Sequence, residues 1–94
     1  MTPADRVARR VVVRGDVQGV FYRDTCLREA ESCGVAGWVR NLPDGSVEAL
    51  FEGSERDVDQ MVDWALAGPR KASVESSDVH EADPGGLTRF EVRD

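Results

Sequence analysis

The chain has 94 residues and a formal net charge of −6 at pH 7, with 40% hydrophobic and 32% charged residues. This length suits one compact domain, and the apolar content is sufficient for a folded core. No run approaches the ~20 apolar residues that span a bilayer, and the acidic balance disfavours an extended nucleic-acid surface. The basic N-terminus has no apolar signal core behind it. We therefore expect residues 1–94 to form a single cytoplasmic domain that works as a monomer, without membrane or nucleic-acid partners.

Residues 10–14 are the first predicted strand, because three consecutive valines are followed by Gly15. Segment 15–20 contains two glycines and predicts a tight loop. A helix follows and ends at the C-cap Gly34. Its apolar positions recur at helical spacing and are Tyr22, Cys26, Ala30 and Cys33.

The two cysteines, Cys26 and Cys33, are two turns apart in this predicted helix. A separation of about 10.5 Å along the axis is too long for a disulfide. The single histidine, His80, lies far along the sequence, so the metal-ligand spacing needed for a cluster is missing. We expect reduced, partly buried thiols and no metal or cofactor.

Residues 35–41 and 46–52 form a predicted hairpin around the turn residues 42–45. The second of these strands alternates apolar and acidic residues, which is typical of a strand with one buried face. Ser54 is a predicted N-cap with Asp57 three residues later, and an amphipathic helix follows until Gly68-Pro69.

Residues 72–81 form a predicted strand in which Val74 and Val79 have opposite parity, which indicates a bulge or an edge position. Residues 87–93 form a short last strand. The order is β-α-β-β-α-β-β. We expect an α+β, ferredoxin-like α/β sandwich, βαββαβ plus a short C-terminal strand, with two helices packed on one face of an antiparallel sheet. The first two strands then run parallel on either side of the third, and their C-terminal ends share one edge.

The loop 15–20 leads from a strand into a helix N-terminus, where backbone N–H groups converge and the helix dipole favours an anion. Arg23 lies in the first turn, where a cation is unfavourable unless a bound anion compensates it. A plain turn with a solvated Arg23 is the more common reason for such glycine spacing, so the loop alone does not decide between a turn and an anion site. The loop has no Walker lysine, no G-x-G-x-x-G spacing and no thiolate, which argues against three other phosphate-binding classes.

Asn41 ends the second strand on the edge that the loop occupies, although asparagine is also common before turns such as 42–45. A carboxamide orients a water molecule but is not a general base at neutral pH. The substrate should therefore carry a labile phosphate. A mixed anhydride of a carboxylic acid and phosphoric acid fits, because its carboxylate leaves without protonation and a phosphate oxygen accepts the proton of the water.

Two stretches closely resemble the signatures of the acylphosphatase family. The first runs from Val13 to Arg23, and the second joins 37–41 with 45–48. The resemblance covers about residues 7–92 and implies a metal-free hydrolase of small acyl phosphates that releases inorganic phosphate, which is also an inhibitor. It implies phosphate binding by Arg23 and orientation of the attacking water by Asn41. The implied phosphate-binding loop is Gly15, Asp16, Val17, Gln18, Gly19 and Val20.

Asp16 departs from the family pattern, since an inward-pointing carboxylate would weaken anion affinity, and the chain ends in Arg93-Asp94 where many relatives end in an aromatic residue. Arg14 and Arg40 are expected to add positive potential near the site. His80 is expected on the surface without a catalytic role. Trp38 and Trp64 are expected in the core or between helices.

Two other functions remain open. One is a binding module that keeps the phosphate loop without turnover, although the presence of both Arg23 and Asn41 argues against it. The other is an acylphosphatase-like domain of a larger carbamoyl-transferring protein. The starting Met1 and the end of the sequence directly after the last predicted strand favour a protein that stands alone.

Overall fold

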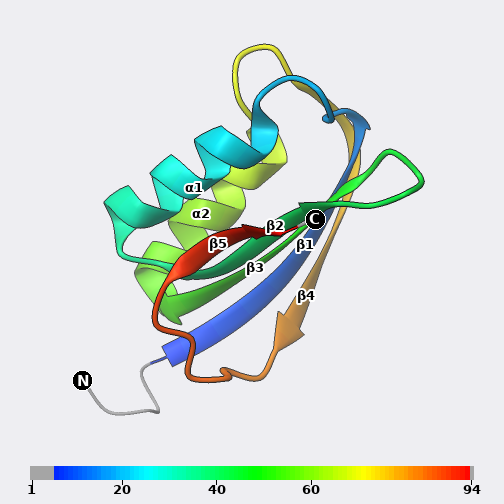
Figure 1. The fold of residues 1–94 in the computed structure, drawn as a ribbon. Helices are drawn as coiled ribbons and strands as arrows, with labels where there is room; N and C mark the ends of the chain where they lie inside the picture. The colour runs from blue at the N-terminus through cyan, green and yellow to red at the C-terminus, as the bar shows by residue number, and fades with distance from the viewer. Residues whose placement is uncertain (1–5, 94) are drawn as a thin grey trace.

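The computed structural model describes residues 6–93, which form a five-stranded sheet with two helices on one of its faces (Figure 1). Neither helix in this part of the chain is long and apolar enough to span a bilayer. The elements in chain order are β1 (Arg6–Asp16), α1 (Tyr22–Cys33), β2 (Ala36–Asn41), β3 (Val47–Ser54), α2 (Glu55–Ala67), β4 (Ser73–Ala82) and β5 (Phe90–Arg93). The predicted order of elements is confirmed.

The strand order in the sheet is β4-β1-β3-β2-β5. Strand β3 pairs antiparallel with both β1 and β2, so β1 and β2 run parallel on either side of it, as predicted. Strand β5 pairs parallel with β2, which makes the sheet mixed rather than antiparallel throughout. The reason is topological. Since β4 is antiparallel to β1, it ends where β1 begins, and the chain then crosses this end of the sheet and starts β5 in the direction of β2 (Figure 1).

Strand β4 is an edge strand whose register with β1 shifts between Arg14 and Gly15. Arg14 lies opposite Ser76 and Gly15 opposite Val74, so one residue of β4 is skipped. Both features predicted from the parity of the β4 valines are therefore present. Gly15 has φ 127°, and a Cβ there would lie 2.3 Å from the backbone oxygen of Ser73. The bulge thus requires glycine at this position.

The core lies between the helices and the sheet, with Phe51 and Met61 among its largest buried side chains. The Oγ of Ser54 accepts a hydrogen bond from the backbone N–H of Asp57 at 3.2 Å, which confirms the predicted N-cap of α2. The hydroxyl of Tyr22 donates to the backbone oxygen of Ala65 at 2.6 Å and joins α1 to α2. The ring of Trp64 lies 5.3 Å from that of Tyr22, so Trp64 packs between helices as expected.

The cysteines are both free, and their positions follow the helical spacing. Cys26 is fully buried, whereas Cys33 is half-buried near the end of α1. Burial, with a smaller contribution from the neighbouring Glu29 carboxylate, raises the pKa of both thiols. Neither thiol is therefore a ready nucleophile at neutral pH.

The carboxylate of Glu52 anchors the segment between β4 and β5. The side chain is completely buried, and Oε1 accepts from the backbone N–H of Gly85 at 2.8 Å. Oε2 accepts from the N–H groups of Gly86 and Leu87 at 2.9 and 3.0 Å, and from Nη2 of Arg6 at 2.9 Å. Burial raises the pKa of Glu52, but these hydrogen bonds outweigh it, and the net shift is below the ordinary value. Residues 87–89 therefore belong to a tethered loop, and the last strand is shorter than the predicted 87–93.

Candidate anion-binding site

A cavity of about 200 Å³ lies where the C-terminal ends of β1 and β2 meet the N-terminus of α1. Arg23 and Asn41, which are 18 positions apart in the sequence, both line it. Val17 and Gly19 of the loop form another part of the cavity wall. The complete lining is Val17, Gly19, Phe21, Tyr22, Arg23, Asp24 and Asn41. The predicted meeting of the loop and the end of the second strand is therefore present.

The loop enters α1 through two residues in left-handed conformation. Gly19 has φ 76°, and Phe21, the residue before the helix, has φ 60° and ψ 26°. Within residues 6–93, the backbone N–H groups of 17–21 donate to no backbone carbonyl. The first N–H groups of any helix also lack partners within it, and α1 has no side-chain cap. Such a run of unused donors at the positive end of a helix dipole is suited to an oxyanion.

Asn41 presents its carboxamide to this cavity from the helix-covered face of the sheet. Alternate residues of a strand share a face, and Val39, two positions earlier, is fully buried in the core. Among the residues that the structure describes, the Oδ1 of Asn41 is buried and has no hydrogen-bond partner. A buried acceptor left without a donor costs about 1–3 kcal/mol. The cavity therefore offers a polar ligand or a water molecule one acceptor that is already desolvated.

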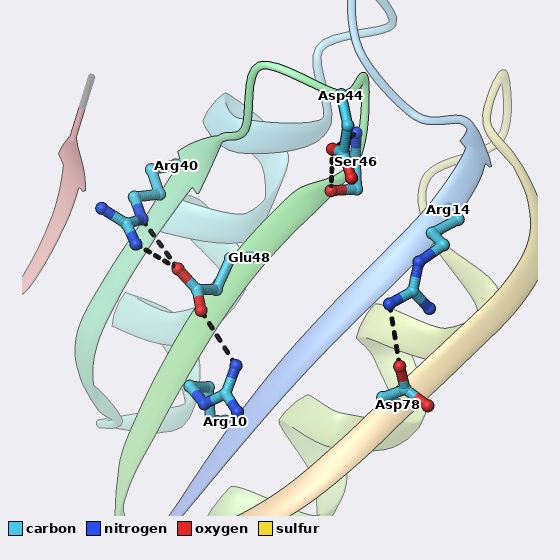
Figure 2. A network of polar contacts seen from close by, with 7 residues as sticks. All are labelled: Arg10, Arg14, Arg40, Asp44, Ser46, Glu48 and Asp78. Atoms are coloured by element: carbon cyan, nitrogen blue, oxygen red, sulfur yellow. Dashed lines mark hydrogen bonds and ion pairs between the residues drawn. The ribbon is translucent and has the colours of Figure 1, made fainter.

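Gln18 holds the loop against the β2–β3 turn. Its Nε2 donates to the backbone oxygens of Leu42 and Ser46, both at 2.8 Å. In the turn, the carboxylate of Asp44 accepts from the hydroxyl and the backbone N–H of Ser46, and these hydrogen bonds lower the pKa of Asp44 (Figure 2). Sequence reasoning assigned Gln18 to the loop through its backbone and missed this side-chain role. The two carbonyls are 24 and 28 positions from Gln18 in the sequence, so no local pattern predicts these hydrogen bonds.

Arg23 lies in the first turn of α1 and is half-buried. Its Nη1 donates to the backbone oxygen of Arg93 at 3.4 Å, so the end of β5 lies beside the cavity. Asp94 lies outside the described residues. Within the lining, Arg23 is the one cationic residue and Asp24 the one anionic residue. Asp24 is exposed, and its place in the wall was also missed by sequence reasoning.

Arg14 and Arg40, which were expected to add positive potential near the site, do not line the cavity, and each pairs with a carboxylate. Both point to the open face of the sheet, where Arg14 pairs with Asp78 at 2.8 Å (Figure 2). Glu48 joins Arg40 at 2.6 Å and Arg10 at 3.0 Å on the same face. The reason is the alternation of strand residues, because Arg40 and its neighbour Asn41 must face opposite sides.

Trp38 also lies on this open face, rather than in the core or between helices as expected. The guanidinium carbon atoms of Arg40 and Arg93 lie 5.3 and 5.2 Å from the centre of its ring. Contact of a cation with an aromatic face is favourable at such distances. The half-buried tryptophan is therefore covered by cations instead of by the helices.

The remaining predicted residues fall outside the cavity wall. Gly15 and Asp16, predicted to be in the loop, are instead the last residues of β1, because both pair with β4. Neither these two residues nor Gln18 and Val20 of the loop line the cavity. Asp16 is exposed and does not line the cavity. His80 is an exposed residue of the edge strand β4. Within residues 6–93, no three histidine, cysteine or acidic side chains gather as a metal site would need.

The groups that surround the cavity limit its chemistry. Tyr22 is buried with its hydroxyl bonded to Ala65, and burial raises its pKa, which disfavours the phenolate as a base. The thiol of Cys26 is buried one turn further along α1. The lining offers backbone donors, the guanidinium of Arg23, the carboxamide of Asn41 and the exposed carboxylate of Asp24. The first three bind and orient an oxyanion and a water molecule and supply no covalent nucleophile, whereas the carboxylate would repel a bound oxyanion.

The fold and this site define a class of protein, a small ferredoxin-like α+β domain in which a strand–loop–helix turn and a neighbouring strand end enclose one polar cavity. The acylphosphatase family model matches residues 9–92. The acylphosphatase of Rubrobacter xylanophilus is 55% identical over 89% of this chain and 77% of that protein. The acylphosphatase of Anaeromyxobacter dehalogenans is 50% identical over 96% and 98%. The solved structure of an acylphosphatase from Coxiella burnetii has a TM-score of 0.90 and 32% identity, covering 96% of this chain and 95% of that one. The chain belongs to the acylphosphatase family.

Proposed function

We propose that the protein is an acylphosphatase that hydrolyses the carboxyl–phosphate anhydride of small acyl phosphates to a carboxylate and inorganic phosphate, without a metal ion. Membership of the family supports the activity. The observation that carries the mechanism is the cavity in which Arg23 and the unpartnered Oδ1 of Asn41 face a single space.

In this mechanism the phosphate group occupies the loop at the start of α1. The backbone N–H groups of residues 16–20 donate to its oxygens, and the guanidinium of Arg23 pairs with two of them. A planar guanidinium suits this bidentate contact, and the helix dipole adds positive potential at the same place. Together these donors stabilise the charge that spreads over the phosphoryl oxygens in the transition state.

Asn41 positions the attacking water. Its Oδ1 accepts one hydrogen of the water, so that a lone pair of the water oxygen points at phosphorus. The new P–O bond forms as the bond between phosphorus and the acyl oxygen breaks, and the carboxylate leaves with the bonding electrons. A phosphate oxygen takes the proton of the water, so no side chain acts as general base.

The proposal also covers the cellular compartment, the oligomeric state and the partners of the enzyme. Residues 1–94 work as one cytoplasmic domain and as a monomer, with inorganic phosphate as product and competitive inhibitor and with no nucleic-acid or membrane partner. The two free cysteines fit a reducing compartment, and the charge of −6 disfavours nucleic acid. Gel filtration tests the monomer directly.

The activity is tested by hydrolysis of acetyl phosphate in the presence of EDTA. Arg23→Ala and Asn41→Ala should each lower kcat/KM by about 10²–10³-fold, the cost of removing one transition-state donor or orienting group. Arg28→Ala, which removes the same charge from an exposed position on the same helix, should stay within about twofold.

Four outcomes would contradict the proposal. Activity at the wild-type level in either site variant would exclude the assigned roles. Loss of turnover in EDTA that returns with a divalent cation would exclude the metal-free mechanism. Efficient hydrolysis of a simple alkyl phosphomonoester would exclude the dependence on a carboxylate leaving group. Folded protein that binds phosphate without turnover would instead identify a binding module.

A further inference from the structure

We infer that Phe21 determines acyl-group specificity, and that its ring selects acyl phosphates whose acyl group is apolar and ring-bearing. This inference rests on the proposed function and concerns the part of the substrate that the phosphate-binding groups do not touch. It is carried by three observations on one residue: its backbone conformation, its exposure and its place in the cavity wall.

The backbone at Phe21 does not call for phenylalanine. Of the non-glycine residues in the described chain, Phe21 alone has a positive φ, at 60°. An L-residue with a Cβ is sterically disfavoured in this region, and glycine or asparagine adopts it more readily. A left-handed residue is typical of loops whose successive N–H groups converge on an anion. Glycine would provide this geometry with less strain, so the ring has another purpose.

The fold gains little from the ring. The side chain of Phe21 is 69% exposed, the most of any large hydrophobic residue in residues 6–93. The other large exposed apolar residues, Val79 and Val92, lie on strands. Phenylalanine normally stabilises a protein by burial, which is mostly absent here. The strained backbone and the exposed ring of Phe21 thus both disfavour phenylalanine at this position in the folded protein.

The place of Phe21 in the cavity wall explains both the strained backbone and the exposed side chain. Phe21 lines the cavity together with Arg23 and Asn41, which hold the phosphate and the water in the proposed mechanism. In this inference, a substrate whose phosphate occupies the loop directs its acyl group away from the loop donors and past Phe21, whose exposed side chain is available to it. Val17 and Tyr22 add apolar surface to the same wall. An aromatic acyl group would therefore cover ring surface that is now in water, and an acetyl group would cover little of it.

The size of the effect follows from the area involved. Aromatic side chains offer about 150–250 Å² of surface. Withdrawal of about 60 Å² of it from water corresponds to about a tenfold gain in affinity. The wild-type protein should therefore show a higher kcat/KM for benzoyl phosphate than for acetyl phosphate.

The test compares both substrates across a small set of variants. Phe21→Gly and Phe21→Asn keep a residue that tolerates the left-handed conformation, and Phe21→Tyr keeps the ring. Val79→Ala is the matched control, since it removes exposed apolar surface from strand β4. We expect Phe21→Gly and Phe21→Asn to lower kcat/KM for benzoyl phosphate about tenfold and that for acetyl phosphate by less than about twofold. Phe21→Tyr and Val79→Ala should retain the wild-type ratio.

A second readout does not depend on turnover. Calorimetric titration with benzoylphosphonate and acetylphosphonate should show the same selective loss of benzoylphosphonate affinity in Phe21→Gly. An unchanged ratio between the two ligands, or an equal fall for both, overturns the inference while leaving the proposed function intact. Absence of hydrolysis by the wild type overturns the proposed function, and the phosphonate ratio still decides the role of the ring.

Discussion

Replacement of Glu52 by glutamine should lower the free energy of unfolding by about 3 kcal/mol. The carboxylate serves four donors, and glutamine keeps its size but replaces one acceptor oxygen by an amide that is itself a donor. Hydrogen bonds to a charged group are worth about 1.5–3 kcal/mol each. With the glutamine oxygen in the place of Oε2, the hydrogen bond from Gly85 is lost and the other three become weaker bonds to a neutral acceptor. The glutamine side chain recovers part of this loss because it is less costly to bury than a charge. The midpoint temperature should fall by roughly 12–24 °C for a domain of this size.

The same variant makes a prediction about pH. Because hydrogen bonds hold the pKa of Glu52 below its usual value in the folded protein, the carboxylate stabilises the fold above the unfolded pKa of about 4.3. This contribution is lost as the pH falls through the folded pKa. The difference in unfolding free energy between wild type and Glu52→Gln should therefore be constant from pH 7 to about pH 5.5 and should shrink below about pH 4.

Urea unfolding followed by tryptophan fluorescence measures both effects. Glu81→Gln is the control, since its side chain is 86% exposed and lies 3.9 Å from Arg9, a contact that should contribute less than about 0.5 kcal/mol. A loss below about 1 kcal/mol for Glu52→Gln at pH 7 would refute the hydrogen-bond reasoning. A difference that persists unchanged at pH 3 would refute the assignment to the ionised carboxylate.

Three further changes test other parts of the structure. Gly15→Ala places a Cβ 2.3 Å from the oxygen of Ser73, so it should destabilise the protein by at least about 2 kcal/mol in urea, and a loss below about 0.5 kcal/mol would contradict the bulge geometry. Gln18→Ala removes both hydrogen bonds to the β2–β3 turn and should lower kcat/KM for acetyl phosphate about tenfold, whereas unchanged kinetics would show that the loop holds its place without them. A thiol reagent at pH 8 should modify the half-buried Cys33 before Cys26, and reaction of Cys26 in the folded protein would contradict its burial.

Local signals in the sequence predicted the elements well. Ser54 and Asp57 mark the start of α2 within four residues, and the opposite parity of Val74 and Val79 shows the register shift of β4. The direction of β5 was not predictable in the same way, because it depends on where the preceding loop crosses the sheet. The hydrogen bonds of Glu52 that tether this loop connect residues more than 30 positions apart.

The candidate site was predictable where topology and a motif agreed, and less so where side-chain direction mattered. The parallel arrangement of β1 and β2 brings Asn41 to the loop that leads to Arg23. Strand alternation alone is sufficient to place Arg40 on the face opposite Asn41, where it pairs with Glu48, although its position next to Asn41 in the sequence suggested positive potential near the site. The exposure of Phe21 and the contacts of Gln18 depend on the loop conformation, which no periodicity describes.

The position of β4 at the edge of the sheet also bears on how copies of the protein meet one another. An edge strand leaves one row of backbone donors and acceptors open to pairing with another molecule, which is a route to aggregation. Here the register shift interrupts the regular row, and the strand carries the acidic residues Glu75, Asp78 and Glu81. Joining two copies through β4 would bring these carboxylates together and would require the interrupted backbone to align. The same irregularity that demands glycine at position 15 thus helps to keep the sheet from extending into neighbouring molecules.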